Sequence, residues 1–377
     1  MFDFHPALVL RPADKADISR AVKFAGKTGT PVAVRSGNHS LAGHGSCDDC
    51  ILIDLSTMKE LDIDVEGRTA WAETGLTAGE YTVAVGKHGL ATGFGDTGSV
   101  GIGGITLGGG FGYLVRKYGL TIDELLAADV VTGGMLILPA TPKVLVSFIE
   151  EAQAAPDDLS AIANVMKAPP MPFLPPEYHG KVVLMGMLAH SGDPAEADGV
   201  IGRFRSLATP IVDMVKPIRY PELFPKEQGG GYHPIAATDT IFTESIDERQ
   251  AESALDRLVS SKAQMAYLQL RALGGAMARV GVHDTAFAHR TSRIMATLGA
   301  IYEDPAERVQ HEAWVADFLA ALRQGEAGSY VNFMGAVSAE RVRAAYPGPT
   351  WDRLVAIKNR YDPANVFRFN QNIQPSG

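Results

Sequence analysis

The chain of 377 residues contains only two cysteines, Cys47 and Cys50, which form a Cys-Asp-Asp-Cys sequence. A CxxC pair is typical of a redox motif or of half a zinc site. No second Cys/His pair at ligand spacing accompanies it, and no thioredoxin-like strand-to-helix context surrounds it. We therefore expect two free thiols in a reducing compartment, no metal site, and a cytoplasmic protein.

Long apolar runs and an excess of basic residues are also missing. No stretch approaches the length of a bilayer span, and no charged segment followed by an apolar one opens the chain. The 34 Lys and Arg residues are outnumbered by 43 Asp and Glu residues, which gives a net charge of −9. This balance argues against nucleic acid or an anionic membrane as the partner, and it favours a small-molecule substrate.

What is present is an ordinary globular composition with abundant glycine. The sequence is 46% hydrophobic and 20% charged, and its length favours two domains over one. The 40 glycines gather in the first third of the chain. Two Gly-rich loops lie in this part of the chain.

The first loop, Arg35–Ser40, follows a short apolar run at Pro31–Val34. A strand that leads into a Gly-rich loop presents consecutive N–H groups to an anionic ligand such as a pyrophosphate. A second Gly-rich segment spans Gly93–Gly112, and the chain closes on Asn370-Gln371-Asn372. The glycines do not form the fingerprint of a nicotinamide-binding Rossmann fold, because no strand–GxGxxG–helix unit with a downstream acidic residue is present.

These three segments, in this order, resemble the FAD-linked oxidases of the vanillyl-alcohol oxidase superfamily (PCMH-type FAD-binding), and in particular their berberine-bridge-enzyme-like branch. In that family the first loop reads Arg-Ser-Gly-Gly-His, and its His is bonded covalently to the 8α carbon of FAD. The resemblance implies FAD as the cofactor and His39 as its attachment point. Asn38 replaces the second Gly of the family, and Asn tolerates a left-handed backbone better than most residues.

The resemblance also implies a set of cofactor-binding residues. Some relatives form a second covalent bond through a Cys in the second loop, but Thr97 takes that position here, so one bond is expected. The predicted cofactor-binding residues are Arg35, Ser36, Gly37, Asn38, His39, Ser40, Gly43 and His44 in the first loop, Thr97, Gly98, Ser99, Gly101, Gly103 and Gly104 in the second, and Asn370 and Asn372 near the C-terminus.

Tyr330-Val331-Asn332 resembles the Tyr-x-Asn motif of the family, in which the Tyr projects from a strand toward the flavin and serves in several relatives as the base. A base would accept the substrate hydroxyl proton during hydride removal. The alternative is a buried Tyr that only satisfies its own hydroxyl. His289-Arg290 resembles the Pro-His-Arg motif and is interpreted as facing the site, and Gly229–His233 as a loop at the substrate entrance.

The order of the predicted elements fits an α+β fold, and the resemblance implies its domains: a two-subdomain FAD-binding domain over residues 1–132, an antiparallel-sheet substrate domain with helices on one face over 133–345, and a C-terminal segment over 346–377 that returns to the FAD domain. Strands are predicted at 6–12, 31–34, 51–55, 61–65, 68–73, 125–132, 134–138, 160–166, 181–190 and 263–273. Helices are predicted at 15–27, 77–88, from 141 onward, and at 195–208, 244–262 and 305–324.

Two parts of the family pattern are expected to be missing. Relatives carry a further N-terminal segment, and they continue after the strand that ends at Thr132 through an Arg-Gly-Gly-Gly-Gly-Asn-Phe-Gly segment that contributes adenosine-side contacts. Here Gly133 follows at once. The reasons could be a true deletion, a mis-assembled gene or a gap closed up in the sequence.

The leading functional hypothesis is an FAD-dependent oxidase that removes a hydride from a small alcohol, sugar or amine and passes the electrons to O₂. One alternative is a dehydrogenase of the same fold with another electron acceptor. The other is a non-catalytic member of the family that is unable to hold FAD because of the missing segment.

Overall fold

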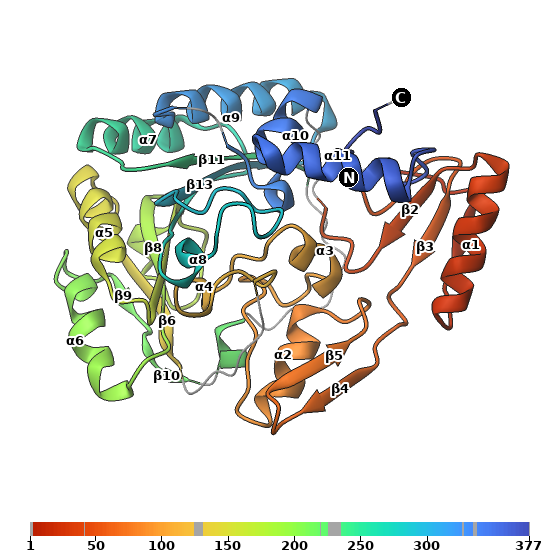
Figure 1. Ribbon diagram of the computed structural model, residues 1–377. Helices are drawn as coiled ribbons and strands as arrows, with labels where there is room; N and C mark the ends of the chain where they lie inside the picture. The colour runs from red at the N-terminus through yellow and green to blue at the C-terminus, as the bar shows by residue number, and fades with distance from the viewer. Residues whose placement is uncertain are drawn as a thin grey trace.

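A computed structural model describes residues 3–40, 42–123, 131–218, 220–224, 235–325, 328–334 and 338–376 of the chain. It has an N-terminal part with a small parallel sheet and a larger part with one long antiparallel sheet (Figure 1). The mixed helix-and-sheet architecture confirms the predicted α+β class. None of the described helices is long and apolar enough to cross a membrane.

The small sheet is parallel, with strand order β1-β3-β2. Its strands are β1 (Leu8–Leu10), β2 (Val32–Arg35) and β3 (Ile51–Asp54). Helix α1 (Lys15–Thr28) covers one face and buries Ala25 against Ile51 and Ile53. The helix ends where predicted, at Gly29, whose φ of 69° suits glycine in a left-handed C-cap.

A hairpin and three helices complete the N-terminal part. The hairpin pairs β4 (Leu61–Asp64) with β5 (Thr69–Ala72). Helix α2 (Ala78–Gly86) opens with a capping box, in which Thr77 and Glu80 each satisfy the backbone N–H of the other. The short helix α3 (Ile102–Leu107) lies within the second Gly-rich segment, and α4 (Val115–Tyr118) comes directly after it.

The large sheet is antiparallel at every pairing, in the order β10-β6-β8-β7-β12-β13-β11, with β9 also paired to β6. Its strands are β6 (Val131–Pro139), β7 (Leu159–Lys167), β8 (Val182–His190), β9 (Val212–Asp213), β10 (Lys216–Ile218), β11 (Ile235–Thr243), β12 (Met265–Ala272) and β13 (Ile294–Tyr302).

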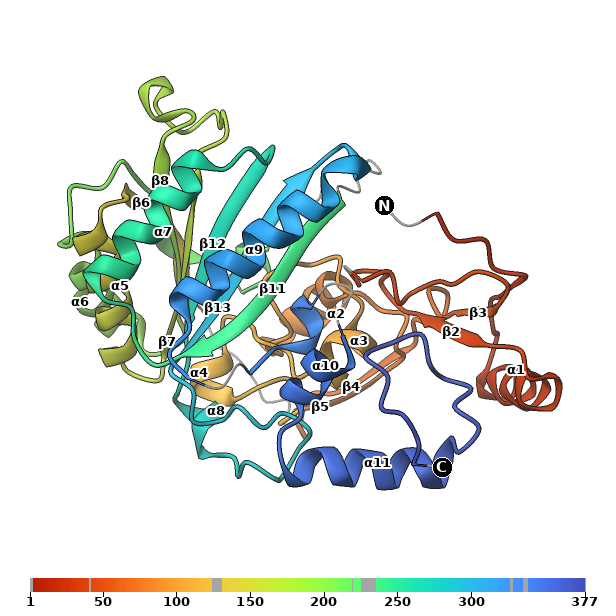
Figure 2. The same ribbon diagram turned by 90° about the horizontal axis from the view of Figure 1, so that it is seen from above.

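Four helices cover the outer face of this sheet, as predicted (Figures 1 and 2). They are α5 (Pro142–Ala154), α6 (Pro194–Arg205), α7 (Glu248–Ser260) and α9 (Arg308–Leu322). Every second residue of the central strands, for example Leu268, Leu270 and Leu298, is buried beneath them in the largest core of the molecule. The inner face looks toward α4 and α8 (Ala276–Arg279).

The C-terminal segment runs through α10 (Ala339–Ala345) and α11 (Pro349–Tyr361) back to the small sheet. The Val32 N–H donates to the Val366 carbonyl at 3.4 Å. Val366 and Phe367 pack against the core of the small sheet. The last residues of the chain are thus held beside the first Gly-rich loop.

The predictions differ from the structure around residue 130 and in two long strands. Of the strand predicted at 125–132, residues 125–130 lie outside the described ranges, whereas Val131 and Thr132 begin β6 of the large sheet. Strands β11 and β13 were not predicted, although each has nine residues. Their sequences mix small residues and threonine and therefore lack a strong hydrophobic alternation.

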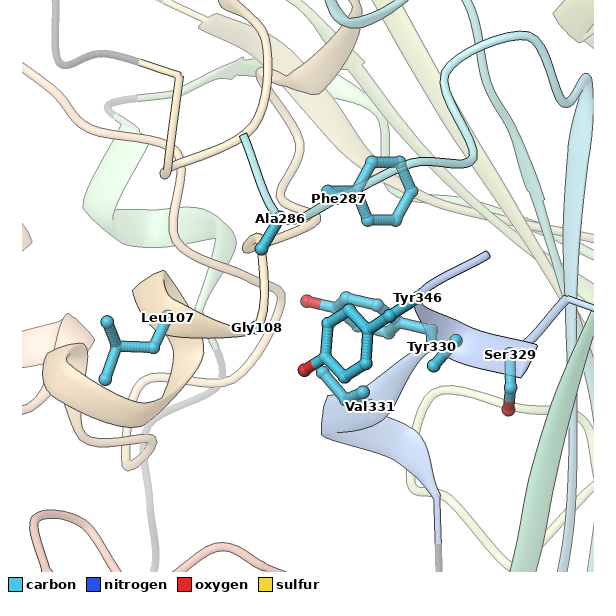
Figure 3. Close-up of a pocket in the computed structure, with 9 residues that line it drawn as sticks. Leu107, Gly108, Ala286, Phe287, Ser329, Tyr330, Val331 and Tyr346 are labelled. Carbon is cyan, nitrogen blue, oxygen red and sulfur yellow. The ribbon is translucent and has the colours of Figure 1, made fainter. Parts of the chain in front are cut away.

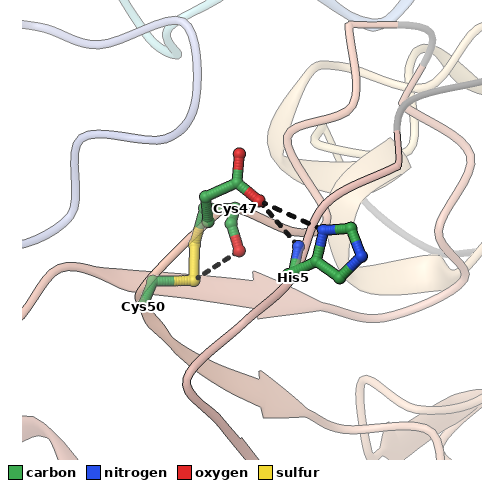
Figure 4. Close-up of a disulfide and its surroundings, with 4 residues drawn as sticks. His5, Cys47 and Cys50 are labelled. Atoms are coloured by element: carbon green, nitrogen blue, oxygen red, sulfur yellow. Dashed lines mark hydrogen bonds and ion pairs between the residues drawn. A yellow bond between two sulfur atoms is a disulfide. The ribbon is translucent and has the colours of Figure 1, made fainter.

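The prediction of two free thiols is wrong: Cys47 and Cys50 form a disulfide (Figure 4). Their Cα atoms lie 5.9 Å apart in a tight turn directly before β3, and both residues are buried. The sulfurs pack with Ala33 and Leu52 of the small sheet and with Phe369 of the C-terminal segment. The absence of a thioredoxin context argued against a catalytic pair, but it does not argue against a buried structural bridge.

Candidate active site

The two Gly-rich loops interlock backbone to backbone. A Cβ atom built on Gly37 would lie 2.1 Å from the Gly101 nitrogen, and one built on Gly101 would lie 2.1 Å from Ser36 Oγ. Ser36 Oγ in turn donates a hydrogen bond to the Thr74 carbonyl. No side chain larger than hydrogen fits at either position, so the contact between the two loops requires glycine at both.

The tip of the first loop presents polar groups to solvent. Asn38 has a φ of 57°, which agrees with the expectation that Asn accepts the left-handed conformation of the family's glycine. Asn38, His39 and Ser40 are exposed. His39 Nε2 lies 2.7 Å from Ser99 Oγ of the second loop, so the predicted attachment residue bridges the two loops.

The other predicted residues of the first loop hold its shape. The Arg35 guanidinium pairs with the buried Asp54 carboxylate at 2.9 Å. Gly43 adopts a φ of 76°, and the His44 N–H donates to Ser40 Oγ at 3.3 Å. Burial lowers the pKa of the His44 imidazole, which favours its neutral form.

Burial of Asp54 would by itself raise the pKa of its carboxyl group. The hydrogen bonds from Arg35, from Ser56 and from Arg11 outweigh this effect and hold that pKa well below its ordinary value. Asp54 stays ionised at neutral pH and fixes the Arg35 end of the loop.

In the second loop, the predicted glycines differ in how much room they have. Gly98 lies against α2, where its carbonyl accepts from the Gly79 N–H at 2.8 Å. A Cβ on Gly103 would lie 3.0 Å from Thr74 Cβ, whereas one on Gly104 would meet no atom within 4 Å. Thr97 Oγ1 donates to Asp96 Oδ1 at 3.2 Å.

Tyr330 joins the second loop to the large sheet. It precedes a short 3-10 helix (Val331–Phe333) and is not on a strand, unlike its counterpart in the family pattern. Its phenol oxygen accepts hydrogen bonds from the Gly110 N–H at 2.9 Å and from Asn332 Nδ2 at 2.8 Å. Its own backbone N–H donates to Thr240 Oγ1 of β11 at 2.8 Å.

Burial raises the pKa of Tyr330 to about 12, although both donors to its oxygen act in the opposite direction. The ring is 2% exposed and lies edge-on to Phe111, with the ring centroids 4.8 Å apart. Two donors aimed at one phenol oxygen stabilise a phenolate, and burial opposes it. The two hydrogen-bond donors thus favour loss of the Tyr330 proton, whereas burial, the larger effect, favours the protonated phenol.

A small, shallow pocket opens beside Tyr330. In Figure 3 the hydroxyl ends of Tyr330 and Tyr346 point toward the Leu107–Gly108 side of this pocket. Leu107 is 77% exposed, an unusual position for a large apolar side chain on a Gly-rich segment. The residues that line the pocket are Leu107, Gly108, Ala286, Phe287, Ser329, Tyr330, Val331, Ala345 and Tyr346.

The C-terminal amides reach the same region. Gln371 Nε2 donates to the Val331 carbonyl at 3.0 Å, next to Tyr330. Asn372 Oδ1 is buried and has no hydrogen-bond partner within the described residues, whereas Asn370 is exposed. A buried amide oxygen without a donor indicates a missing ligand group or water.

The interpretation of Arg290 as facing the site is wrong. Arg290 is fully buried and forms a two-pronged ion pair with Asp123, because a buried guanidinium needs a carboxylate to balance it. His289 stacks on Phe242 with the ring centroids 4.4 Å apart, and its Nε2 has no partner among the described residues. The predicted entrance loop, Gly229–His233, lies outside the described residues.

Several residues near the site were not predicted. A Cβ on Gly108 would lie 2.0 Å from Asn332 Oδ1, and Gly110 supplies the N–H to Tyr330. Asp96 forms an ion pair with Arg271 on the inner face of the large sheet. The alternation of Gln269 and Arg271 along a predicted strand was a usable signal, because it places both on one face.

Comparisons with known proteins agree with this geometry. The family described as FAD binding domain matches residues 6–135, and the family described as berberine and berberine like matches residues 329–374. The first match contains both Gly-rich loops, and the second contains Tyr330, Asn332 and the C-terminal amides. The regions that converge in space are therefore the regions that the two families describe.

Several curated proteins are similar over nearly the whole chain. (R)-6-hydroxynicotine oxidase from Paenarthrobacter nicotinovorans is 27% identical over 423 residues, which cover 99% of this chain and 92% of that protein. Chitooligosaccharide oxidase from Gibberella zeae is 25% identical over 438 residues, 99% of this chain and 88% of that protein. Both alignments are longer than this chain, so the relatives contain aligned residues that it lacks.

The fold is also found in a solved structure. The crystal structure of 6-hydroxy-D-nicotine oxidase from Arthrobacter nicotinovorans superimposes with a TM-score of 0.84 at 21% identity, covering 100% of this chain and 93% of that one. The location of the missing residues after Thr132 stays a prediction.

Proposed function

Because the chain carries the FAD binding domain and the berberine-like segment of the FAD-linked oxidoreductases and belongs with them, we propose that it is an oxidase of that family. In this proposal it removes a hydride from a carbon bearing a hydroxyl or amino group of a small molecule and uses O₂ as acceptor. The relatives named for a sugar oligomer and for hydroxynicotine support this range of substrates. The observation that carries the proposal is the contact of the two Gly-rich loops with each other, together with the contact of the second loop with Tyr330.

The residues present fit FAD. The interlocked Gly37 and Gly101 hold the two loops together, and the backbone at Gly104, where a Cβ would meet no atom within 4 Å, is open to the approach of a cofactor. The Asn372 oxygen lacks a donor within the described residues, and an N–H of a bound ring would supply one. The first loop, the second loop and the C-terminal amides are therefore the groups that would hold the cofactor.

When bound, FAD would supply the redox chemistry, as the acceptor of the substrate hydride and the donor of two electrons to O₂ with release of H₂O₂. The chain must remove the remaining hydroxyl proton. In the proposal the Tyr330 oxygen accepts that proton as the phenolate, which the Gly110 N–H and the Asn332 amide stabilise, and it gives the proton up again when H₂O₂ forms. Loss of the hydride and of this proton leaves the carbonyl product, which is oxidised by two electrons relative to the substrate.

We further propose that His39 forms the one covalent bond to FAD. Its exposed imidazole lies at the contact of the two loops, 2.7 Å from Ser99 Oγ. Thr97 offers no thiol, and both cysteines of the chain are joined in a disulfide away from the second loop. Such a bond prevents loss of the cofactor, and the electron-withdrawing substituent makes the flavin a stronger oxidant.

The test is a visible spectrum of the purified protein before and after precipitation with trichloroacetic acid. Flavin absorbance that stays in the pellet, and that disappears from the pellet in His39→Ala but not in the surface control His88→Ala, supports the covalent bond. Flavin released into the supernatant would show that His39 does not form a covalent bond to the flavin. No flavin at all, even after incubation with FAD, would remove the oxidase proposal.

The acceptor is tested separately on the flavin-loaded protein. After reduction with dithionite in the absence of oxygen, admission of O₂ is expected to restore the oxidised spectrum within seconds and to yield H₂O₂. A flavin that stays reduced under O₂ but is reoxidised by an artificial dye would make the protein a dehydrogenase.

A further inference from the structure

A row of polar side chains crosses the inner face of the large sheet. Asn164 of β7 is paired in register with Gln269 of β12, Gln269 with Thr297 of β13, and Thr297 with Thr240 of β11. Their sequence neighbours, such as Ala163, Leu270 and Ala296, point into the core under the helices, so these four face the other way. We call Asn164, Gln269, Thr297 and Thr240 the amide row.

The amide row ends beside the candidate base. Thr240 Oγ1 accepts a hydrogen bond from the backbone N–H of Tyr330, so the Thr240 end of the row contacts the residue proposed to take the substrate proton. Three intervals between neighbouring strands, at about 4.8 Å each, give the row a length of about 14 Å. Asn164 and Gln269 are only half-buried, which leaves the far end of the row accessible.

Arg271 fixes the direction of the amides. Arg271 Nε donates to Gln269 at 3.0 Å, and a guanidinium has no acceptor, so the atom of Gln269 that receives this bond is its oxygen. The amide nitrogen of Gln269 then donates to Asn164 at 2.7 Å, which makes the receiving atom the Asn164 oxygen. The NH₂ group of Asn164 therefore points away from Gln269, and it donates to no other described residue.

The row carries no net charge. The Arg271 guanidinium is 5% exposed, pairs with Asp96 of the second Gly-rich loop and donates to the Phe111 carbonyl. It is therefore already neutralised and cannot balance a carboxylate on a substrate. Within the described residues, the acidic group at this face is Asp96, and its carboxylate already pairs with Arg271. A protonated amine would therefore find no free carboxylate here.

One hydroxyl in the row also lacks a partner. Thr297 Oγ1 is buried and makes no hydrogen bond to the described residues, between Gln269 and Thr240. Buried polar groups are nearly always paired in native proteins, and a water or ligand group commonly supplies the missing bond. The amide row thus combines the NH₂ group of Asn164, which has no acceptor among the described residues, with the unpaired hydroxyl of Thr297.

We propose that the amide row binds the hydroxyl oxygens of a neutral polyhydroxylated substrate, of the sugar type, and holds it with its reacting carbon next to Tyr330. The inference rests on the proposed oxidase function and selects within its substrate range. N–H donors with no net charge match hydroxyl and ether oxygens, whereas amines and carboxylates would need a counter-ion that the row does not offer.

The test adds two sets of compounds to the flavin-loaded protein without oxygen and follows bleaching of the flavin band. The neutral set is cellobiose, lactose and diacetylchitobiose, and the charged set is benzylamine, nicotine and glucuronate. Reduction or a spectral shift with at least one neutral sugar, and none with the charged compounds, is expected. A response to amines or carboxylates alone, or to no neutral sugar, would overturn the proposal.

The row itself is tested with Asn164→Asp, which replaces the NH₂ group by an oxygen of nearly the same shape. The KM for the responding sugar is expected to rise about three- to tenfold with little change in kcat, because one ground-state hydrogen bond is lost. Gln310→Glu at an exposed position of α9 adds the same charge elsewhere and should leave KM unchanged.

Asn164→Leu provides a second variant in case the aspartate disturbs folding, and it should raise KM to a similar extent. An unchanged KM in both variants would show that the row does not contact the substrate. Failure of the oxidase proposal looks different: the protein would hold no flavin, or O₂ would leave dithionite-reduced flavin unchanged.

Discussion

The cofactor cradle, where residues 35–45 meet residues 93–112, and the inner face of the large sheet are built in opposite ways. In the cradle, backbone lies on backbone, and an added Cβ atom would come within 2.1 Å of its neighbours at Gly37 and Gly101. On the sheet face the strands satisfy their own backbone, and side chains alone meet the site. A substitution in the cradle must therefore move the chain, whereas one on the face changes only the chemistry presented.

The largest effect is expected for Gly101→Ala. The new methyl group would overlap the Gly37 nitrogen and Ser36 Oγ, so the two loops must separate. We expect a loss of roughly 4 kcal/mol in the free energy of unfolding, or failure to fold, together with loss of FAD. Urea unfolding and flavin content of the purified protein measure the two losses.

Gly104→Ala is the matched control, because it lies three residues further on, in α3, and its Cβ would meet no atom within 4 Å. It should keep or raise stability, by up to about 1 kcal/mol, since alanine favours a helix over glycine. If both variants lose the same stability, the contrast between crowded and open glycines is mistaken. A stable Gly104→Ala protein without flavin would show that FAD approaches there.

The second prediction concerns Tyr330, where the cradle and the sheet face meet. Tyr330→Phe removes the oxygen that accepts from Gly110 and Asn332, and we expect a loss in kcat of at least about a hundredfold. The two unpaired donors should cost about 1–2 kcal/mol of stability. Stopped-flow flavin reduction and urea unfolding separate the two effects.

Phe333→Leu offers a control for Tyr330→Phe, because Phe333 packs edge-on against the Tyr330 ring without touching its oxygen. If Tyr330→Phe reduces flavin at the normal rate, Tyr330 is a structural residue that satisfies two donors, and the base must be another group. The pH dependence adds a check: a base with a pKa near 12 would leave the rate rising across the whole measurable alkaline range, and a plateau would show that bound FAD lowers that pKa.

The contrast between the two regions also explains what the sequence could predict. Glycine is required where two backbones touch, so Gly37 and Gly101 appear in the sequence within two recognisable Gly-rich segments. The interlocking of the two loops in the structure agrees with that pattern. The amide row left little trace, because Asn164 and Gln269 are ordinary residues on regular strands. Their pairing depends on strand order and register, which a single sequence does not reveal.

Two further misses have local physical causes. The Cys47–Cys50 bridge depends on a turn that brings the two Cα atoms to 5.9 Å, and that geometry is not visible in the spacing alone. Arg290 was interpreted as a site residue from its motif, but its partner Asp123 lies 167 positions away in the chain. A buried ion pair between distant segments is encoded only in the folded arrangement.

The third prediction tests how the first loop is anchored at its Arg35 end. Asp54→Asn should cost about 2 kcal/mol at neutral pH, because Asp54 is 2% exposed in its side chain and pairs with Arg35 and Arg11. The folded pKa is below the unfolded one, so this stability is present above the unfolded pKa and is lost as the pH falls through the folded pKa. The variant should therefore show a flatter stability profile at the acid end.

Glu312→Gln, which breaks the exposed pair with Arg308, is the control for Asp54→Asn and should cost at most about 0.5 kcal/mol. Equal losses in the two variants would contradict the view that burial makes the Asp54 pair important. Urea unfolding at neutral and acidic pH decides between these outcomes.

The smallest effect is expected on the sheet side, at His289. Burial lowers the pKa of this imidazole to about 4, and its stacking on Phe242 does not depend on charge. Between that value and the ordinary 6.5, the unfolded chain binds the proton more readily, so stability falls as the pH drops through this window. From pH 7 to pH 5.5 we expect His289 to account for a loss of roughly 1 kcal/mol.

His289→Phe keeps an aromatic ring on Phe242 and removes the titrating group, so the stability profile of the variant should be flatter in that window, whatever its offset at pH 7. His283→Phe in an exposed segment provides the matched control and should leave the slope unchanged. An unaltered slope in His289→Phe would mean that His289 titrates alike in the folded and unfolded chains.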